Sequence, residues 1–302
     1  MIGKALSSLL IRQGYRVVIF SRGLSSARQG QDPALLYASW DVNKQTYDRT
    51  AVESADYIVH LAGAGVADKR WSAKRKKEIE ESRTGSCALL VRALKETDNH
   101  VKAVVSSSAI GWYGPDPVIP NPKPFVETDA ASDDFLGKTC KLWEESIDPV
   151  ARHGRRLVKI RTGLVLSREG GAFAEFSKPV KFGIAGILGS GKQVISWIHM
   201  EDLCRIYLMA IEDNSLSGVY NGVAPKPVNN KELTLQIAKT MKSNFYIPMY
   251  VPSFALRIVF GELSVEVLKS ATVNCDKIRK AGFNIVFPSI ESAVNDLAGP
   301  KK

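Results

Sequence analysis

The stretch of the sequence best equipped for chemistry is residues 106–114, which carry three serines, a tryptophan and a tyrosine. It follows an apolar segment that we interpret as a strand, and α/β folds bind ligands beyond the carboxyl ends of their strands. Ser and Tyr hydroxyls can polarise a carbonyl oxygen and transfer a proton. We therefore take Ser108 and Tyr113 as candidate catalytic residues. A serine-rich turn without chemical function is the alternative.

Two further places suit a phosphorylated ligand. Gly3 lies at the start of a helix predicted over residues 1–13, where free N–H groups and the helix dipole favour an anion such as a pyrophosphate. Close packing of that helix on a strand is the alternative. Ser21 and Arg22 follow a strand predicted over residues 15–20. Folds that bind NAD place an acidic residue there, whereas an arginine accommodates the 2′-phosphate of NADP. The pair therefore favours NADP, with an ordinary turn as the alternative.

Other motifs carry weaker signals. Small residues at 62–65 follow a predicted strand and would let a ligand approach the backbone, while His60 itself is expected to pack in the core. Residues 186–192 (GILGSGK) come close to a phosphate-binding loop. Gln193 stands where that loop requires Ser or Thr for magnesium, so we expect a glycine-rich hairpin with Lys192 near an anion. The four histidines are isolated, so no metal site is predicted.

Apolar strand patterns alternate with helical patterns through the first two-thirds of the chain. This alternation predicts an α/β fold, a Rossmann-like doubly wound parallel sheet covered by helices. A domain over 1–166 is followed by a smaller, mainly helical region over 167–302 on the substrate side, with some segments returning to the sheet. Strands are expected over 15–20, 36–40, 57–61, 101–106 and 157–166, and helices over 1–13, 75–96, 135–153, 231–241, 253–269 and 290–297.

The beginning of the chain departs from this pattern. A sheet of this kind opens with a strand and a glycine-rich turn, but this chain starts inside that turn, at residues 1–3. We expect either that the start site is misassigned and upstream residues exist, or that the protein is truncated. A central parallel strand is buried on both faces, so its loss should cost stability and half of the phosphate-binding turn.

Composition excludes several classes of protein. The 302 residues are 45% hydrophobic and 24% charged, which excludes a disordered chain and a disulfide scaffold. No apolar run has the length of a membrane span, and four scattered cysteines without a signal peptide indicate a cytoplasmic protein. The net charge is +10, but the one dense basic run, residues 69–77, passes into acidic residues 78–81. We interpret that run as a solvated helix face, and an anionic small ligand explains the charge at least as well as nucleic acid does.

Taken together, these motifs resemble the extended short-chain dehydrogenase/reductases, within the NAD-dependent epimerase/dehydratase-like superfamily. The chain is most similar to the branch of "epimerase family proteins" with a helical carboxy-terminal domain. The opening motif of that family, TGxxGxxG after a strand, is matched only by its last part at Ile2 and Gly3. The other matching motifs are residues 61–63, 67–71, 81–83, 143–145, 161–166, 189–191, 197–199 and 221–225, with the helical domain from about Pro248.

The resemblance implies NADP as cofactor and places Ser108 at the catalytic Ser or Thr position. The usual catalytic YxxxK begins where this chain has Phe135, which has no proton to transfer. Lys138 or Lys141 would substitute for the lysine, and Tyr113 would supply a phenol. The residues expected to bind the cofactor are Gly3, Ser21, Arg22, Asp41, Leu61, Ala62, Gly63, Glu78, Arg83 and Val165.

Two functions follow from this reading. The first is an NADP-dependent oxidoreductase or epimerase-like enzyme acting on a carbonyl or hydroxyl small molecule, such as a nucleotide sugar. The alternative is a catalytically weak or inactive NADP-binding protein that regulates or contacts a protein partner. Neither nucleic acid nor a membrane is an expected partner. Related folds often dimerise through two helices, so a homodimer is a further expectation.

Overall fold

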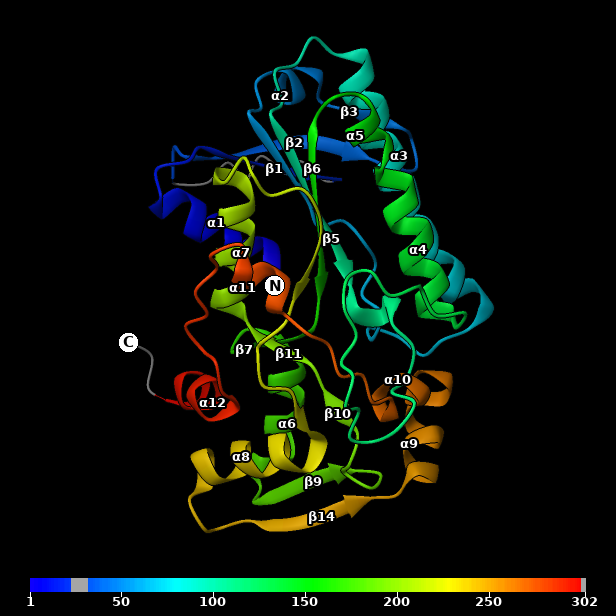
Figure 1. The fold of residues 1–302 in the computed structure, drawn as a ribbon, viewed down its shortest axis with the longest axis vertical. Coiled ribbons are helices and arrows are strands. Elements are labelled where there is room, and N and C mark those ends of the chain that lie inside the picture. The colour runs from blue at the N-terminus through cyan, green and yellow to red at the C-terminus, as the bar shows by residue number, and fades with distance from the viewer. Residues whose placement is uncertain (23–31, 300–302) are drawn as a thin grey trace.

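The structure is a computed structural model, and it describes residues 1–22 and 32–299. Helices cover both faces of a parallel sheet, and a second group of helices and short strands lies at one end of that sheet (Figure 1). The expected α/β, Rossmann-like fold is confirmed. Within the described ranges, no helix is both long and apolar enough to cross a membrane.

The main sheet has the strand order β12-β6-β5-β4, and all of its neighbours are parallel. β5 (Ala103–Ala109) and β6 (Arg156–Thr162) pair along their full length. β4 (Tyr57–His60) flanks β5, and β12 (Gly218–Gly222) flanks β6. Because the strands are parallel, their carboxyl ends share one edge, which is where α/β folds bind ligands.

A separate sheet holds the strands that come earliest in the sequence. β1 (Val17–Ser21) pairs in parallel with β2 (Leu35–Asp41), which pairs antiparallel with β3 (Thr46–Tyr47). Among the described residues, no strand joins β1 to β4. The sheet is therefore interrupted between these two strands.

The two faces of the main sheet carry different helices (Figure 1). α1 (Ile2–Arg12) and α7 (Met200–Glu212) pack on one face, in a core that includes Val105 and Val158. α3 (Ala73–Glu96) and α4 (Phe135–Ile147) pack on the other face. The residues before them in the same strands, Val104 and Leu157, belong to the core on this second face, because the side chains of a strand point alternately to its two faces.

Residues after 166 contribute to both parts, because α7 and β12 belong to the main sheet and its cover, whereas α6 (Ala172–Lys181), α8 (Asn230–Lys242) and α12 (Ile290–Ala298) belong to the second group. A third core lies between α6, α8 and α12. The remaining elements are α2 (Arg49–Glu53), η2 (Ile110–Trp112), α5 (Pro149–Arg152), β7 (Leu164–Ser167), β8 (Gly170–Gly171), β9 (Ile184–Leu188), β10 (Val194–Ile195), β11 (Trp197–His199), β13 (Val228–Asn229), β14 (Ile247–Val251), α9 (Ser253–Phe260), η3 (Gly261–Leu263), α10 (Ser264–Leu268) and α11 (Asp276–Lys280).

Three long elements predicted from the sequence are broken in the structure. The helix expected over 135–153 divides where Pro149 begins α5, because proline has no N–H to continue the first helix. The strand expected over 157–166 divides at Gly163. The helix expected over 253–269 divides at Gly261, whose φ of 59° is a left-handed conformation that glycine adopts readily.

The expected glycine-rich hairpin over residues 186–192 is wrong. β9 pairs in parallel with β14, and β10 pairs antiparallel with β13, so the two strands around this segment do not pair with each other. Gly189 and Gly191 have φ of 59° and 72° in the turn between them, and Lys192 is exposed.

Candidate functional site

Several predicted cofactor residues converge on the amino terminus of α1. A Cβ atom on Gly3 would lie 3.8 Å from Cδ1 of Leu61, so the start of the helix touches the loop that follows β4. On its other side, the side chain of Met1 and the backbone oxygen of Val165 both lie within 4 Å of the Cβ position of Gly171. The helix therefore begins between the loop that follows β4 and the hairpin of β7 and β8.

The amino terminus of α1 is suited to an anion. The helix has 11 residues, Met1 makes no side-chain cap, and the first turn contains no acidic residue. The first N–H groups of a helix lack partners within the helix, and the helix dipole adds partial positive charge there. A pyrophosphate placed at this terminus would accept hydrogen bonds from the backbone without displacing a protein carboxylate.

The loop over residues 61–65 is held in place by α3. The N–H of Ala64 donates to Oγ of Ser82 at 2.9 Å, and Nη1 of Arg83 donates to the Ala64 carbonyl at 3.0 Å. Arg75 donates to the Gly65 carbonyl in the same way. These contacts fix the carboxyl-terminal end of the segment, at Ala64 and Gly65, and so limit the movement of the backbone that a ligand would meet.

Arg83 and Glu78 lie on α3, but their contacts differ. Arg83 packs its guanidinium 4.9 Å from the ring of Trp143, and desolvation by burial lowers its pKa. A Cβ on Gly63 would meet the Arg83 side chain at 3.2 Å, so this loop residue has little room for a larger side chain. Glu78 is exposed and pairs with Nη1 of Arg75 at 2.8 Å, and this hydrogen bond lowers its pKa.

The predicted residues at the ends of β1 and β2 are close to solvent. Ser21 ends β1 and Arg22 follows it with an exposed side chain. Asp41 ends β2, and its Oδ1 accepts the N–H groups of Asn43 and Lys44 at 2.9 and 3.0 Å. The Asp41 carboxylate therefore closes a turn, whereas the guanidinium of Arg22 is accessible to an anion.

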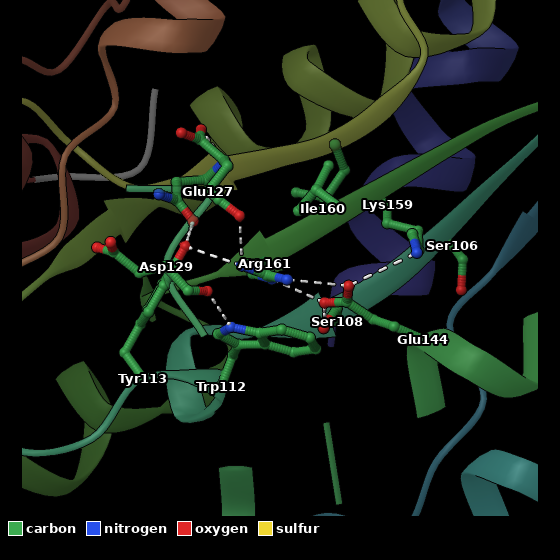
Figure 2. A network of polar contacts seen from close by, with 12 residues as sticks. Ser106, Ser108, Trp112, Tyr113, Glu127, Asp129, Glu144, Lys159, Ile160 and Arg161 are labelled. Carbon is green, nitrogen blue, oxygen red and sulfur yellow. Dashed lines mark hydrogen bonds and ion pairs between the residues drawn. The ribbon is translucent and has the colours of Figure 1, made fainter. Parts of the chain in front are cut away.

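Ser108 belongs to a buried ionic network (Figure 2). It lies inside β5, because this strand runs to Ala109 and not only to the expected residue 106. Its Oγ donates to Oε1 of Glu144 at 2.7 Å. Arg161 holds the same carboxylate through Nε at 2.8 Å and Nη2 at 3.1 Å. Ser108, Glu144 and Arg161 are 2%, 4% and 2% exposed, so none of them faces open solvent.

The network continues to Tyr113. Its hydroxyl donates to Oδ1 of Asn221 at 2.8 Å and accepts from Nη1 of Arg161 at 3.1 Å. Burial raises the pKa of Tyr113 to about 12. The Arg161 guanidinium also lies 3.6 Å from the ring centre of Trp112, a cation–π contact (Figure 2). The network joins strands β5, β6 and β12 to helix α4 and to residue 127.

The third predicted catalytic residue lies apart from this network. Lys138 is exposed on the first turns of α4. Phe135 begins that helix, and its ring meets the ring of Trp71 edge-on at 4.9 Å. The structure thus brings Ser108 and Tyr113 into one network through Arg161, but it gives Lys138 no contact with them.

Sequence reasoning missed several residues that shape the site. Ser82, Glu144 and Arg161 lie in the family motifs and Arg75 lies in the basic run, but none of the four was predicted as a site residue. Their roles depend on contacts between α3 or α4 and residues far away in the sequence. The family motifs offered one signal. They contain Glu144 and Arg161, two opposite charges within apolar segments, and such charges must pair if they are buried.

The remaining candidates for chemistry are packed in the core. His60 is 6% exposed and its Nε2 lies 2.9 Å from Oγ of Ser86, while desolvation lowers its pKa to about 4. The four cysteines are free and buried. Burial raises the pKa of Cys87 and Cys140 to about 12, which suppresses the reactive thiolate. No group of three potential metal ligands occurs in the described part of the chain.

Comparisons with known proteins place the chain in a protein family. Residues 1–135 match the model of the NAD dependent epimerase/dehydratase family, and residues 251–297 match a domain of unknown function, DUF1731. The chain is 32% identical over all of its length to the epimerase family protein YfhF of Bacillus subtilis, of which it covers 96%. It is 31% identical over 98% of its length to the epimerase family protein ML0860 of Mycobacterium leprae, of which it covers 92%.

A crystal structure gives a close likeness in three dimensions. The human epimerase family protein SDR39U1 (isoform 2), crystallised with NADPH, aligns with a TM-score of 0.84 and 28% identity. The alignment covers 99% of this chain and 96% of the human chain. The shared fold therefore includes the carboxy-terminal region as well as the parallel sheet.

Proposed function

The chain belongs to the NAD-dependent epimerase/dehydratase family, and we propose that it binds NADP(H) and uses it as an oxidoreductase or epimerase-like enzyme. The substrate class would be a small carbonyl or hydroxyl compound, such as a nucleotide sugar. The observation that carries the proposal is the position of the uncapped amino terminus of α1, where Gly3 lies next to Leu61 and Met1 lies next to Gly171, which Val165 also contacts. The human relative crystallised with NADPH supports the choice of cofactor.

The residues present fit the charged parts of this cofactor. The N–H groups at the start of α1 would bind the pyrophosphate, and the exposed guanidinium of Arg22 would bind the 2′-phosphate. Leu61 and Ala62 would lie along the adenosine phosphate, on a loop that α3 already holds. Val165 would lie near the nicotinamide, which, when bound, supplies the carbon that exchanges hydride with the substrate.

In this proposal Ser108 polarises the substrate oxygen at the end of β5. Its proton is directed at Glu144, so the hydroxyl must rotate away from that carboxylate before it can donate to a substrate. Tyr113 would supply the proton only if its hydroxyl left Asn221. The exposed Lys138 is free of such a restriction and is the alternative proton donor.

The test is a screen of carbonyl compounds and nucleotide sugars for a change in nicotinamide absorbance, with the Ser108→Ala variant beside the wild type. Ser106→Ala is the matched control, because Ser106 is 1% exposed on the same strand and donates only to a backbone carbonyl. We expect S108A to lower kcat/KM by about 10²- to 10⁴-fold and S106A to leave it nearly unchanged. Equal activity of both variants would remove Ser108 from the mechanism.

A second candidate function is an NADP(H)-binding protein that signals to a protein partner without turnover. Two observations favour it: Phe135 stands at the start of α4 without a transferable proton, and Ser108 is buried against Glu144. Tight NADPH binding without an absorbance change for any substrate would favour this candidate. A Ser108→Ala protein that retains its biological role would also contradict the enzyme.

A further inference from the structure

Two strand edges face each other without a strand between them. In the described part of the chain, β1 pairs only with β2, and β4 pairs only with β5. In a β-strand, the N–H and C=O groups of alternate residues point to opposite sides. Alternate backbone groups of Val17–Phe20 and of Tyr57–His60 therefore point away from their partner strands, as on the edge of a sheet.

These two edges line one cavity. Its volume is about 690 Å³, and it is lined by β1 on one side and β4 on the other. Apolar side chains close it above and below the plane of the sheet. Leu6 and Leu10 of α1 lie on one face, and Val52 and Leu90 on the other. All of β1 is only half-buried, although its sequence is almost wholly apolar.

β1 and β4 run in the same direction across the cavity. At their amino-terminal ends, Tyr15 just ahead of β1 and Tyr57 at the start of β4 both line the cavity. At the other end, the cavity is lined by residues 60–62 and by Gly3, at the start of α1. A strand placed in the cavity parallel to β1 would also be parallel to β4, and it would end beside Gly3.

We propose that this cavity is an acceptor site for an extended apolar peptide strand that pairs in parallel with β1 and β4. A strand of about five residues matches the lengths of its two neighbours. Such an occupant satisfies two rows of backbone groups at once and places apolar side chains against α1 on one face and α3 on the other. A small apolar molecule would fill the volume but leave both rows unpaired. The proposal depends on these edges alone and not on the proposed function.

The test adds a synthetic peptide to the full 302-residue chain. The peptide has a core of valine and isoleucine with flanking lysines for solubility, and the control peptide has N-methylated amides at alternate core positions. Amide hydrogen exchange is followed at residues 17–20 and 57–60. When the free peptide is present at ten times its dissociation constant, about one cavity in ten remains empty. Amide exchange that requires an empty cavity should therefore slow about tenfold. The control peptide should give no such protection.

The direction of the strand is tested by fusion. The same peptide joined ahead of Met1 by a short glycine turn should protect residues 17–20 and 57–60 and raise the Tm, because the strand is proposed to end beside Gly3. The same segment joined after Lys302 should do neither. Three results would overturn the proposal. They are unchanged exchange with both the free and the fused peptide, equal protection by the N-methylated peptide, and protection of these edges in the free protein together with a doubled molecular mass.

Discussion

Replacing Glu144 by glutamine should destabilise the fold strongly, because its carboxylate is the shared partner of a buried network. Glu144 accepts from Ser108 and forms a two-bond contact with Arg161, and Lys159 lies 3.6 Å from its second oxygen. The side chain of glutamine has nearly the same shape but no charge. The substitution would leave the guanidinium of Arg161 buried without its carboxylate.

Removing one partner of a buried ion pair costs about 3–5 kcal/mol, because the other charge has lost its compensation. Arg161 and Glu144 are 2% and 4% exposed, so solvent screening gives no relief. With an unfolding entropy of about 2.1 cal/mol/K per residue, 302 residues give roughly 0.6 kcal/mol/K. The Glu144→Gln variant should therefore lower the Tm by about 5–8 °C.

Thermal and urea unfolding of three variants tests this reasoning. Glu175→Gln is the control, since Glu175 forms an exposed pair with Lys178 at 2.7 Å and should change stability by less than about 1 kcal/mol. The double variant Glu144→Leu with Arg161→Met removes both charges and should recover most of the loss. A loss of less than about 1 kcal/mol for E144Q, equal to that of E175Q, would refute the assignment of Glu144 as the centre of the network.

Three further predictions concern single residues. Because burial lowers the pKa of His60 to about 4, the unfolded chain binds a proton near pH 6.5 that the native protein does not, so stability should fall from pH 6.5 to 4. Urea unfolding at each pH measures this fall in the free energy of unfolding, which should be smaller by up to about 3 kcal/mol in the His60→Gln variant. The same pH dependence in variant and wild type would contradict a neutral, buried His60. Gly163→Ala should destabilise the protein by about 1–3 kcal/mol, because its Cβ would lie 2.6 Å from the Ser196 carbonyl, and a variant as stable as the wild type would show that this contact relaxes. Tyr113→Phe should lower the free energy of unfolding by about 1–3 kcal/mol, because Oδ1 of Asn221 loses the hydrogen bond that the Tyr113 hydroxyl donates. A loss of kcat without a loss of stability would instead identify Tyr113 as the proton donor.

The elements that depend on local pattern were predicted well. The helix over 1–13 and the strand over 36–40 correspond to α1 and β2 within one or two residues. Their apolar periodicity and the glycine that follows the first helix are visible in the sequence alone. The breaks at Gly163 and Gly261 were missed, because an isolated glycine inside an apolar run does not reveal what packs against it. The backbone of Ser196, distant in the sequence, occupies the space beside Gly163.

Part of the candidate site could likewise be located from the sequence, and part could not. The loop after β4 and the start of α1 could be located from the order of strands, since parallel strands end at one edge. The environment of Ser108 could not, because its partner Glu144 lies on a helix 36 positions later. Sequence pattern placed a hydroxyl at the sheet edge, and only the tertiary contact reveals that its proton is already donated to a carboxylate. The cofactor and catalytic roles of these residues stay predictions.

We propose that the carboxyl edge of the sheet binds NADP(H), with Arg22 holding the 2′-phosphate. The most direct measurement is the ratio of the dissociation constants of NADPH and NADH, for the wild type, for Arg22→Ala and for the control Arg16→Ala. Arg16 is exposed just ahead of the opposite end of β1, so its variant makes the same change of charge away from the site. We predict that the wild type prefers NADPH, that R22A weakens NADPH by about tenfold or more without changing NADH, and that R16A changes neither. Equal affinity of the wild type for both nucleotides, or an equal effect of R22A and R16A, would contradict the binding of the 2′-phosphate by Arg22.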